Sequence, residues 1–279
     1  MATESQVTAH YSHGELLARL NAMLAEDGVD PARPTIEALA PYDQFHGRGL
    51  EATEEIAGQL DVAATDHLLD IGSGIGGPAR YMARRFGCRV TGIDLTAEFC
   101  EVARHLSALM GLDARLTFEE GNALAMPFAD AAFDGAYSMN VSMNIEDKGG
   151  FYAELHRVLK PGGWLFLSEI ALGPKDGLDF PTPWAASADE SFLVTPEATL
   201  DGLRAAGFEI VRSGDRVAES LDYSARTRAA VAAGGQPFNR AVELIHGEAA
   251  LAALRNTARA TADGRTVPIE IYYRKPLAA

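Results

Sequence analysis

Short apolar runs alternate with longer amphipathic stretches between about residues 66 and 212. The runs have the length of buried strands, and the stretches repeat apolar residues every three or four positions, as helices do. Such alternation predicts βαβ units and a mainly parallel sheet. The predicted strands are 67–71, 88–93, 115–119, 135–139, 164–169 and 208–212, with helices ending near residue 85 and over 96–110, 150–159 and 195–206.

Helical patterns also flank this region on both sides. Leucines at helical spacing predict a helix over 13–26, and a proline-rich break containing Pro31, Pro34 and Pro41 separates it from a helix at 53–60. We therefore expect an N-terminal helical arm or lid over residues 1–53 and an α/β domain over 54–279.

The last part of the chain predicts a helical insert over about 214–266. Two helices, 218–233 and 238–262, are expected there, followed by an alternating run at 267–274. That run predicts one more strand close to the end of the chain.

Composition and charge narrow the class of protein. The 279 residues are 47% hydrophobic and 23% charged, which is ordinary for a globular chain. The 24 basic and 39 acidic residues give a net charge of −15, which argues against nucleic acid or a membrane surface as a partner. The chain begins without a basic segment followed by an apolar one, so we expect a cytoplasmic protein. Cys88 and Cys100 have no metal-ligand spacing, and no metal is expected.

A glycine-rich turn after the first predicted strand carries the strongest chemical signal. It reads Asp70-Ile71-Gly72-Ser73-Gly74, with Gly77 three residues further on. Small residues at such a turn let a ligand approach the backbone, and Asp94, at the end of the second strand, can accept ribose hydroxyls. The glycine spacing also fits a dinucleotide-binding dehydrogenase. Asp70 decides against that alternative, because its charge would face a pyrophosphate but suits a ligand with an ammonium and a sulfonium.

These residues resemble the class I S-adenosylmethionine-dependent methyltransferases from about residue 54 to 212, together with the last strand. The match extends to Gly92-Ile93-Asp94-Leu95, to Gly121-Asn122-Ala123-Leu124-Ala125-Met126-Pro127-Phe128, where Asn122 replaces the usual aspartate, and to Leu159-Lys160-Pro161-Gly162-Gly163. The resemblance implies a Rossmann-like, seven-stranded, mainly parallel sheet with an antiparallel last strand, and S-adenosylmethionine as cofactor. The cofactor contacts that it implies are Tyr42, Asp70, Gly72, Ser73, Gly74, Asp94, Leu95, Asn122, Ala123 and Ser138.

A closer resemblance is to bacterial methyltransferases of the sarcosine/dimethylglycine type. It is carried by Asp43-Gln44-Phe45-His46, by Met143-Asn144-Ile145-Glu146-Asp147-Lys148 and by Phe180-Pro181-Thr182-Pro183-Trp184-Ala185. It implies a small-molecule methyl acceptor, and a homodimer stays open.

His46 and Asn140 are the candidate catalytic residues. His46 is either a general base for a hydroxyl substrate or a hydrogen-bonding wall. Asn140 follows the fourth strand, where ligands sit in open α/β sheets, and would orient the substrate. For Asn144 we favour a helix-capping role.

Two aromatic residues are candidate substrate contacts. Phe45 either closes over the methyl donor or attaches the arm to the body, as does Tyr42. Trp184 either contacts a substrate amine by a cation–π interaction or, as we favour, packs in a small core beneath its loop.

Three functions stay open from the sequence. The first is methyl transfer to the nitrogen of a small amine or amino-acid derivative, which needs no strong base. The second is an O- or C-methyltransferase of a larger apolar metabolite, and the third is a non-catalytic protein that binds S-adenosylmethionine.

Overall fold

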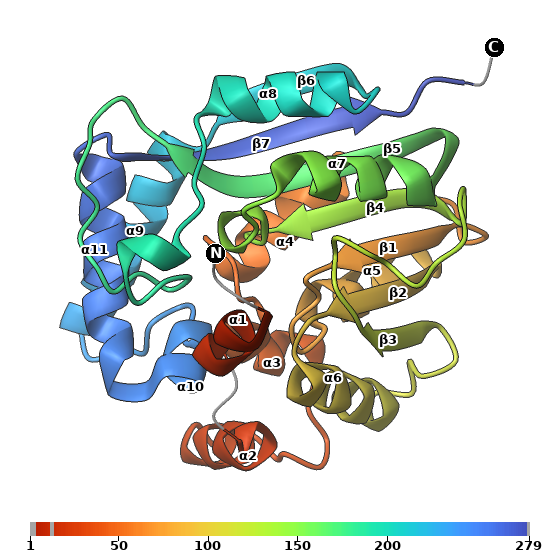
Figure 1. Ribbon diagram of the computed structural model, residues 1–279. Helices are drawn as coiled ribbons and strands as arrows, with labels where there is room; N and C mark the ends of the chain where they lie inside the picture. Colours follow the sequence, from red (N-terminus) through yellow and green to blue (C-terminus); the bar gives the residue numbers. More distant parts are fainter. Residues whose placement is uncertain (1–3, 12–13, 278–279) are drawn as a thin grey trace.

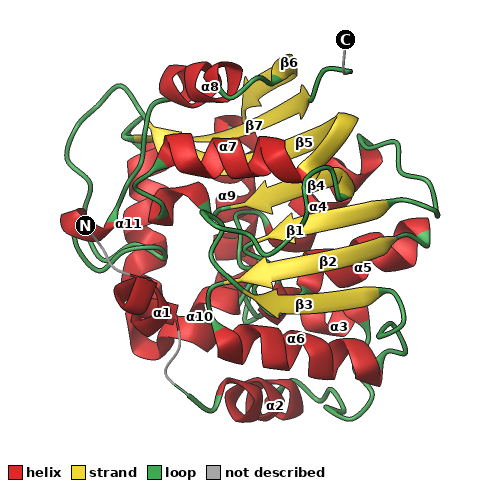
Figure 2. Ribbon diagram, turned by 45° about the vertical axis from the view of Figure 1, so that its right-hand side comes forward, coloured by secondary structure: helices red, strands yellow, loops and turns green. Residues whose placement is uncertain are grey.

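The computed structural model describes residues 4–11 and 14–277, in which seven strands form one sheet (Figures 1 and 2). Their order across the sheet is β3-β2-β1-β4-β5-β7-β6. The first five strands run parallel, and β7 is antiparallel to both of its neighbours. The fold class predicted from the sequence is confirmed. The strands are β1 (His67–Ile71), β2 (Arg89–Asp94), β3 (Leu116–Glu120), β4 (Phe133–Met139), β5 (Leu159–Leu172), β6 (Glu209–Asp215) and β7 (Thr266–Arg274).

Helices cover both faces of the sheet, which explains why the central strands β1, β2 and β4 are apolar runs rather than alternating ones. Leu68 packs in a cluster with residues of α4 (Gly49–Gly58) and α5 (Gly77–Phe86), whereas Leu69 packs on the other side with α7 (Lys148–Val158). The remaining core helices are α6 (Ala97–Leu109) and α8 (Pro196–Ala205), with short 3₁₀ turns η1 (Ser142–Asn144) and η2 (Ala188–Glu190).

The N-terminal arm contains a helix inside the predicted proline-rich break. After α1 (Glu4–Tyr11) and α2 (Leu16–Glu26), the chain forms α3 (Ile36–Asp43), with Pro41 in its last turns. The Thr35 side chain caps its first turn by accepting a hydrogen bond from the Ala38 N–H, and burial of Ile36 and Leu39 offsets the bond that proline cannot make. The prediction of a break was therefore wrong for residues 36–43.

The insert between β6 and β7 consists of α9 (Val217–Ala232), α10 (Ala241–His246), η3 (Gly247–Ala249) and α11 (Ala250–Ala262). The single helix predicted over 238–262 is divided, because Gly247 has φ 52° and ends α10. No helix in the described part of the chain combines the length and the apolar composition needed to cross a bilayer.

Most of the arm is part of the core rather than a detachable cover. Leucines of α2 and α3 pack against Phe99 and Leu106 of α6 and against Leu244 of α10. The Asp43 carboxylate and the Arg80 guanidinium form an ion pair at 2.8 Å with both side chains completely buried. The proposed domain boundary at residue 53 falls inside α4.

Candidate functional site

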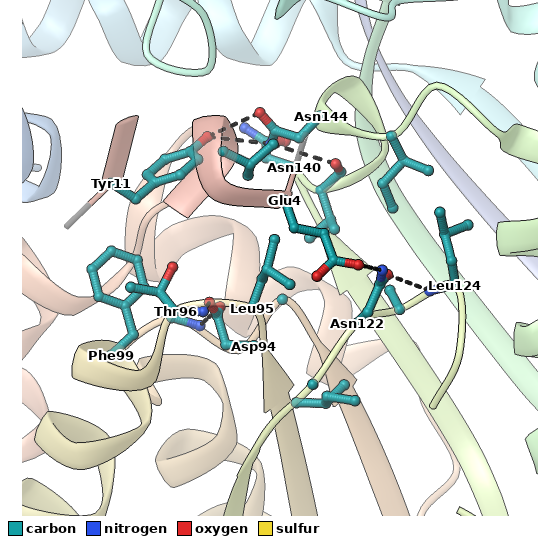
Figure 3. A pocket seen from close by; sticks show the side chains of 18 of the residues that line it. Glu4, Tyr11, Asp94, Leu95, Thr96, Phe99, Asn122, Leu124, Asn140 and Asn144 are labelled. Carbon is teal, nitrogen blue, oxygen red and sulfur yellow. Dashed lines mark hydrogen bonds between the residues drawn. The ribbon is translucent and has the colours of Figure 1, made fainter. Parts of the chain in front are cut away.

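A cavity of about 400 Å³ opens beyond the carboxyl ends of β1, β2 and β4 (Figure 3). In Figure 2 the arrowheads of β1, β2 and β3 point toward the side where α1 and α10 lie. In open α/β sheets, ligands bind at this edge. The predicted residues that line the cavity are Phe45, Gly72, Gly74, Asp94, Leu95, Asn122, Ala123 and Asn140.

The glycine turn forms the floor of the cavity. Gly72 and Gly74 have φ values of 68° and 52°, a backbone region that other residues rarely adopt. A Cβ at Gly72 would overlap the Val141 side chain, and one at Gly74 would lie 2.8 Å from the Phe45 ring. The Gly72 and Ser73 N–H groups both donate to the Ile93 carbonyl, at 2.8 and 3.1 Å, which fixes the turn beside β2.

Asp94 presents its carboxylate to this floor. Oδ2 accepts a hydrogen bond from the Gly74 N–H at 2.8 Å, and Oδ1 accepts one from the Thr96 N–H at 2.9 Å. Burial raises the pKa of this carboxyl above its usual range. A carboxylate has about four lone-pair sites, so both oxygens retain capacity for a ligand's hydroxyl groups.

Asp70 lies beneath the floor and is buried. Its Oδ2 has no hydrogen-bond partner among the described residues. Burial raises the pKa of Asp70 to about 8, against a lowering by the neighbouring Tyr137 hydroxyl and with a smaller rise from the charge of Asp94. A buried carboxylate in this condition favours a cationic neighbour. Ser73 is also buried below the turn, with no hydrogen-bond partner for its Oγ among the described residues.

Helix α1 reaches over the opposite side of the cavity (Figure 3). The Asn122 Nδ2 donates to the Glu4 carboxylate at 2.6 Å, and its Oδ1 accepts from the Leu124 N–H at 2.8 Å. Both ends of the Asn122 amide are therefore engaged, the first by a residue more than a hundred positions away in the chain.

A second, smaller cavity of about 40 Å³ adjoins the first one. Tyr11, Phe45 and Asn140 line both cavities, so these three side chains form the shared wall. The Tyr11 hydroxyl hydrogen bonds with the Asn144 amide at 3.2 to 3.4 Å, and burial raises the pKa of Tyr11. Asn144 thus holds α1 in place, while Asp147 caps α7, so the predicted capping role of Asn144 was wrong.

His46 does not reach either cavity. It is buried, with Nε2 3.1 Å from both Gln44 Oε1 and Thr53 Oγ1, and Nδ1 3.2 Å from the Gly47 carbonyl. Burial lowers its pKa to about 4, so it is neutral at physiological pH. The structure contradicts a catalytic role for His46 and favours the other alternative, a buried hydrogen-bonding residue.

Tyr42 and Ser138 likewise line neither cavity. The Tyr42 hydroxyl donates to the Asp27 carboxylate, and its ring packs among the leucines of α2, so Tyr42 attaches the arm to the body. The Ser138 hydroxyl donates to Glu169 Oε1 at 3.2 Å. Both side chains are buried and hydrogen bonded within the protein, so their cofactor contacts stay predictions that the cavity lining does not favour.

Trp184 packs in the small core that we favoured, and its contact with a substrate amine stays a prediction. Its ring packs with Met143 and Ala185 in a small core beneath the loop, and it also lines the smaller cavity. The indole N–H donates to Ser191 Oγ at 2.9 Å, so its polar atom is already satisfied.

Several lining residues could not be found from the sequence. They belong to α1 and to the insert and include Glu4, Val7, Tyr11, Val242, Ile245 and His246. No local motif marks them. Only a strong α1 helix signal could have indicated the first three, and the eight residues of α1 show no amphipathic pattern.

The strand order, the glycine turn and the two acidic strand ends define the class I methyltransferase fold. Residues 69–167 match the model of the methyltransferase domain family. The methyltransferase GfsG of Streptomyces halstedii is 35% identical over 174 residues, which cover 61% of this chain and 60% of GfsG. The chain thus spans less than two thirds of that relative.

Two solved structures share the fold more broadly. The putative sarcosine dimethylglycine methyltransferase of Galdieria sulphuraria has a TM-score of 0.66 at 21% identity and covers 81% of this chain and 86% of its own. The [4+2]-cyclase SpnF has a TM-score of 0.68 at 24% identity and covers 99% of this chain and 98% of its own. At these identities the likeness concerns the fold alone.

Proposed function

We propose that this protein transfers a methyl group from S-adenosylmethionine to a small molecule. The observation that carries the proposal is the buried Asp70 carboxylate, with its unpartnered Oδ2, beneath a glycine turn that keeps the cavity floor free of side chains. A ligand with an ammonium group and a sulfonium supplies the positive charge that this carboxylate favours. The match of residues 69–167 to the methyltransferase domain supports the same ligand.

The residues of the larger cavity divide between the parts of such a ligand. Asp70 and the backbone of Gly72 and Gly74 would hold the amino-acid end, and Asp94 would accept the ribose hydroxyls. Leu95, Asn122 and Ala123 would enclose the adenine. The Asn122 carbonyl can accept a second hydrogen bond, while its amide nitrogen is held by Glu4.

S-adenosylmethionine, when bound, offers a methyl group on a positively charged sulfur, which a nucleophile can displace. The chain contributes positioning and exclusion of water. Tyr11 and Phe45 enclose the wall between the cavities, and the Asn140 amide can orient a polar acceptor there. We infer that α1 acts as a lid, which is supported by Glu4, Val7 and Tyr11 lining the larger cavity.

We further propose that the acceptor atom is the nitrogen of a small amine or amino-acid derivative. At the shared wall, the asparagine amide takes no proton near neutral pH, and burial raises the pKa of Tyr11, which keeps its hydroxyl protonated. A deprotonated amine already carries its lone pair, so it reacts without a strong base. The Galdieria protein with a similar fold is named for such an acceptor, sarcosine.

The test is transfer of a radiolabelled methyl group to sarcosine and to p-cresol, run side by side, with calorimetric titration of S-adenosylmethionine. Binding and labelling of sarcosine are expected. Absence of binding would refute the proposal as a whole. Binding without transfer to either probe would favour a non-catalytic binding protein.

One observation favours the second candidate, an O- or C-methyltransferase. His46 lies away from the cavities, but His246 of α10 lines the smaller one, with Nε2 3.1 Å from the Pro183 carbonyl. Imidazole takes protons near neutral pH, which a hydroxyl acceptor requires. Labelling of p-cresol that His246→Asn reduces by about 10²-fold or more would establish this candidate instead.

A further inference from the structure

A buried carboxylate that lines neither cavity holds the loop after β4. Glu169 of β5 is 3% exposed. Its Oε2 accepts hydrogen bonds from the Val141 and Ser142 N–H groups, both at 3.1 Å, and its Oε1 accepts one from the Ser138 hydroxyl at 3.2 Å. One carboxylate therefore fixes two consecutive backbone amides at the point where the chain leaves β4.

The same loop is fixed at its other end by a cation. The Lys148 ammonium donates to the Ser142 and Ile145 carbonyls. Glu169 thus binds the N–H groups at the start of η1, and Lys148 binds carbonyl groups of the same turn. Opposite charges at the two ends match the direction of the peptide dipoles.

The residue before these amides is held in an unfavourable conformation. Asn140 has φ 59°, in the left-handed region that asparagine adopts more readily than most residues but at some energetic cost. Its own N–H donates to the Ser168 carbonyl at 2.8 Å, next to Glu169 on β5. Val141, which follows, supplies the side chain that packs against Gly72 in the cavity floor.

We propose that Glu169 is a positioning residue for the methyl-transfer site, because its grip on Val141 and Ser142 sets Asn140 and Val141 against the cavity. This inference rests on the proposed binding of S-adenosylmethionine. Glu169 contacts neither cavity, so it acts only through the loop.

The ionised form of Glu169 grips the loop better than the neutral form. Charge-assisted hydrogen bonds are roughly twice as strong as neutral ones. Burial raises the pKa of Glu169 to about 7, and the groups that face it are Lys148, Tyr152, Ser138 and Ser142. As the pH falls below 7, protonation of Glu169 therefore weakens its hydrogen bonds with the Val141 and Ser142 N–H groups, and Asn140 is held less firmly.

The test compares wild type with Glu169→Gln and Glu169→Ala. Glutamine keeps one carbonyl acceptor without the charge, and alanine removes both acceptors. We expect S-adenosylhomocysteine, titrated calorimetrically at pH 8, to bind about five-fold more weakly to Glu169→Gln and more weakly still to Glu169→Ala. At pH 5.5 the affinities of wild type and Glu169→Gln should converge.

A second measurement reads the loop without any ligand. In amide NMR spectra, the Val141 and Ser142 resonances of wild type should shift with a midpoint near pH 7, and those of Glu169→Gln should not. Glu270→Gln is the matched control, because Glu270 is a buried carboxylate on the adjacent strand β7 whose partners are Arg48 and Arg216. It should leave both resonances and the affinity unchanged.

The outcomes separate this inference from the proposed function. If S-adenosylhomocysteine does not bind to wild type, the proposed function fails, and the NMR titration still tests the grip of Glu169. Val141 and Ser142 resonances that do not titrate in wild type, or that titrate equally in Glu169→Gln, would overturn the inference. So would an affinity ratio that stays constant between pH 5.5 and pH 8.

Discussion

The floor and the roof of the larger cavity are built in different ways. The floor comes from the glycine turn after β1 and from Asp94 at the end of β2, two segments within about 25 residues of each other. The roof of the larger cavity comes from α1 and from Phe45 of the arm. Over the smaller cavity, α10 and the loop before α8 continue this roof. The floor is mainly backbone and carboxylate, whereas the roof is mainly side chains brought together by tertiary packing.

We therefore expect the floor to bind S-adenosylmethionine and the roof to select the methyl acceptor. Backbone groups and buried carboxylates suit one constant ligand, and their geometry depends on positive φ angles that few substitutions tolerate. Aromatic and apolar side chains on a separate segment can be exchanged without disturbing the sheet. Mutations in the floor should therefore affect the affinity for S-adenosylmethionine, and mutations in the roof should affect the choice and turnover of the acceptor.

The largest expected effect concerns the unfolding free energy, which the buried Asp70 beneath the floor should lower once it ionises. Burial raises the pKa of Asp70 to about 8, so this residue stabilises the fold fully below its unfolded value near 4 and loses that contribution as the pH rises toward 8. Asp70→Asn does not ionise. From pH 4 to pH 8 its unfolding free energy should therefore rise relative to wild type by on the order of 5 kcal/mol.

Urea denaturation at pH 4, 6 and 8 measures this change, and calorimetry on the same variant should show weaker binding of S-adenosylmethionine. A stability difference between wild type and Asp70→Asn that is independent of pH would mean that Asp70 is solvated. Ionisation of Asp70 would then not lower the unfolding free energy.

The second prediction concerns the junction of arm and floor. Asp43 and Arg80 are both completely buried at 2.8 Å, so Asp43→Ala leaves an uncompensated guanidinium in the core and should destabilise the fold by about 3–5 kcal/mol. The exposed pair of Arg84 and Glu37 lies close by and provides the control, since Glu37→Ala should cost less than about 1 kcal/mol. Equal losses in thermal and urea unfolding would show that the arm is not part of the core.

The third prediction isolates the floor's polar contact. Asp94→Ala should weaken S-adenosylmethionine binding by about 1.5–3 kcal/mol, the usual contribution of hydrogen bonds to a charged group. Asp94→Asn keeps one acceptor, so its affinity for S-adenosylmethionine should lie between those of wild type and Asp94→Ala. Wild-type affinity of the alanine variant in a calorimetric titration would remove Asp94 from the proposed site.

The sequence predicted the floor well because its signals are local. Asp70, Gly72, Gly74 and Asp94 lie at strand ends, where a short motif determines both the backbone conformation and the side-chain position. The order of strands and helices was also predictable from periodicity, apart from α1, the helix that contains Pro41 and the division of the insert at Gly247.

The roof could not be predicted because its residues become neighbours only by tertiary packing. His46 is the instructive error. It lies next to Phe45, which does reach the cavity, but it is turned inward by hydrogen-bonding groups on Gln44 and Thr53. Adjacent residues of an irregular segment face different directions, and the sequence carries no periodicity there that would distinguish them.

The smallest expected effect removes part of the roof while leaving the floor intact. Residues 4–11 form α1, in which Glu4 accepts a hydrogen bond from Asn122 and Tyr11 hydrogen bonds with Asn144. The Tyr11 ring also packs against Phe99, and His10 contacts the Pro183 carbonyl. Deletion of residues 1–11 should leave the unfolding midpoint nearly unchanged, because the buried leucines of the arm begin at Leu16. It should weaken S-adenosylmethionine binding by only about 1 kcal/mol, the usual contribution of a single hydrogen bond. Turnover should fall much more, because closure of the site excludes water.

Glu4→Gln serves as the control, since it alters one contact and keeps the helix. A truncated protein that labels its acceptor at the wild-type rate would show that α1 is not a lid. A large loss of affinity together with the loss of turnover would instead make α1 part of the binding floor.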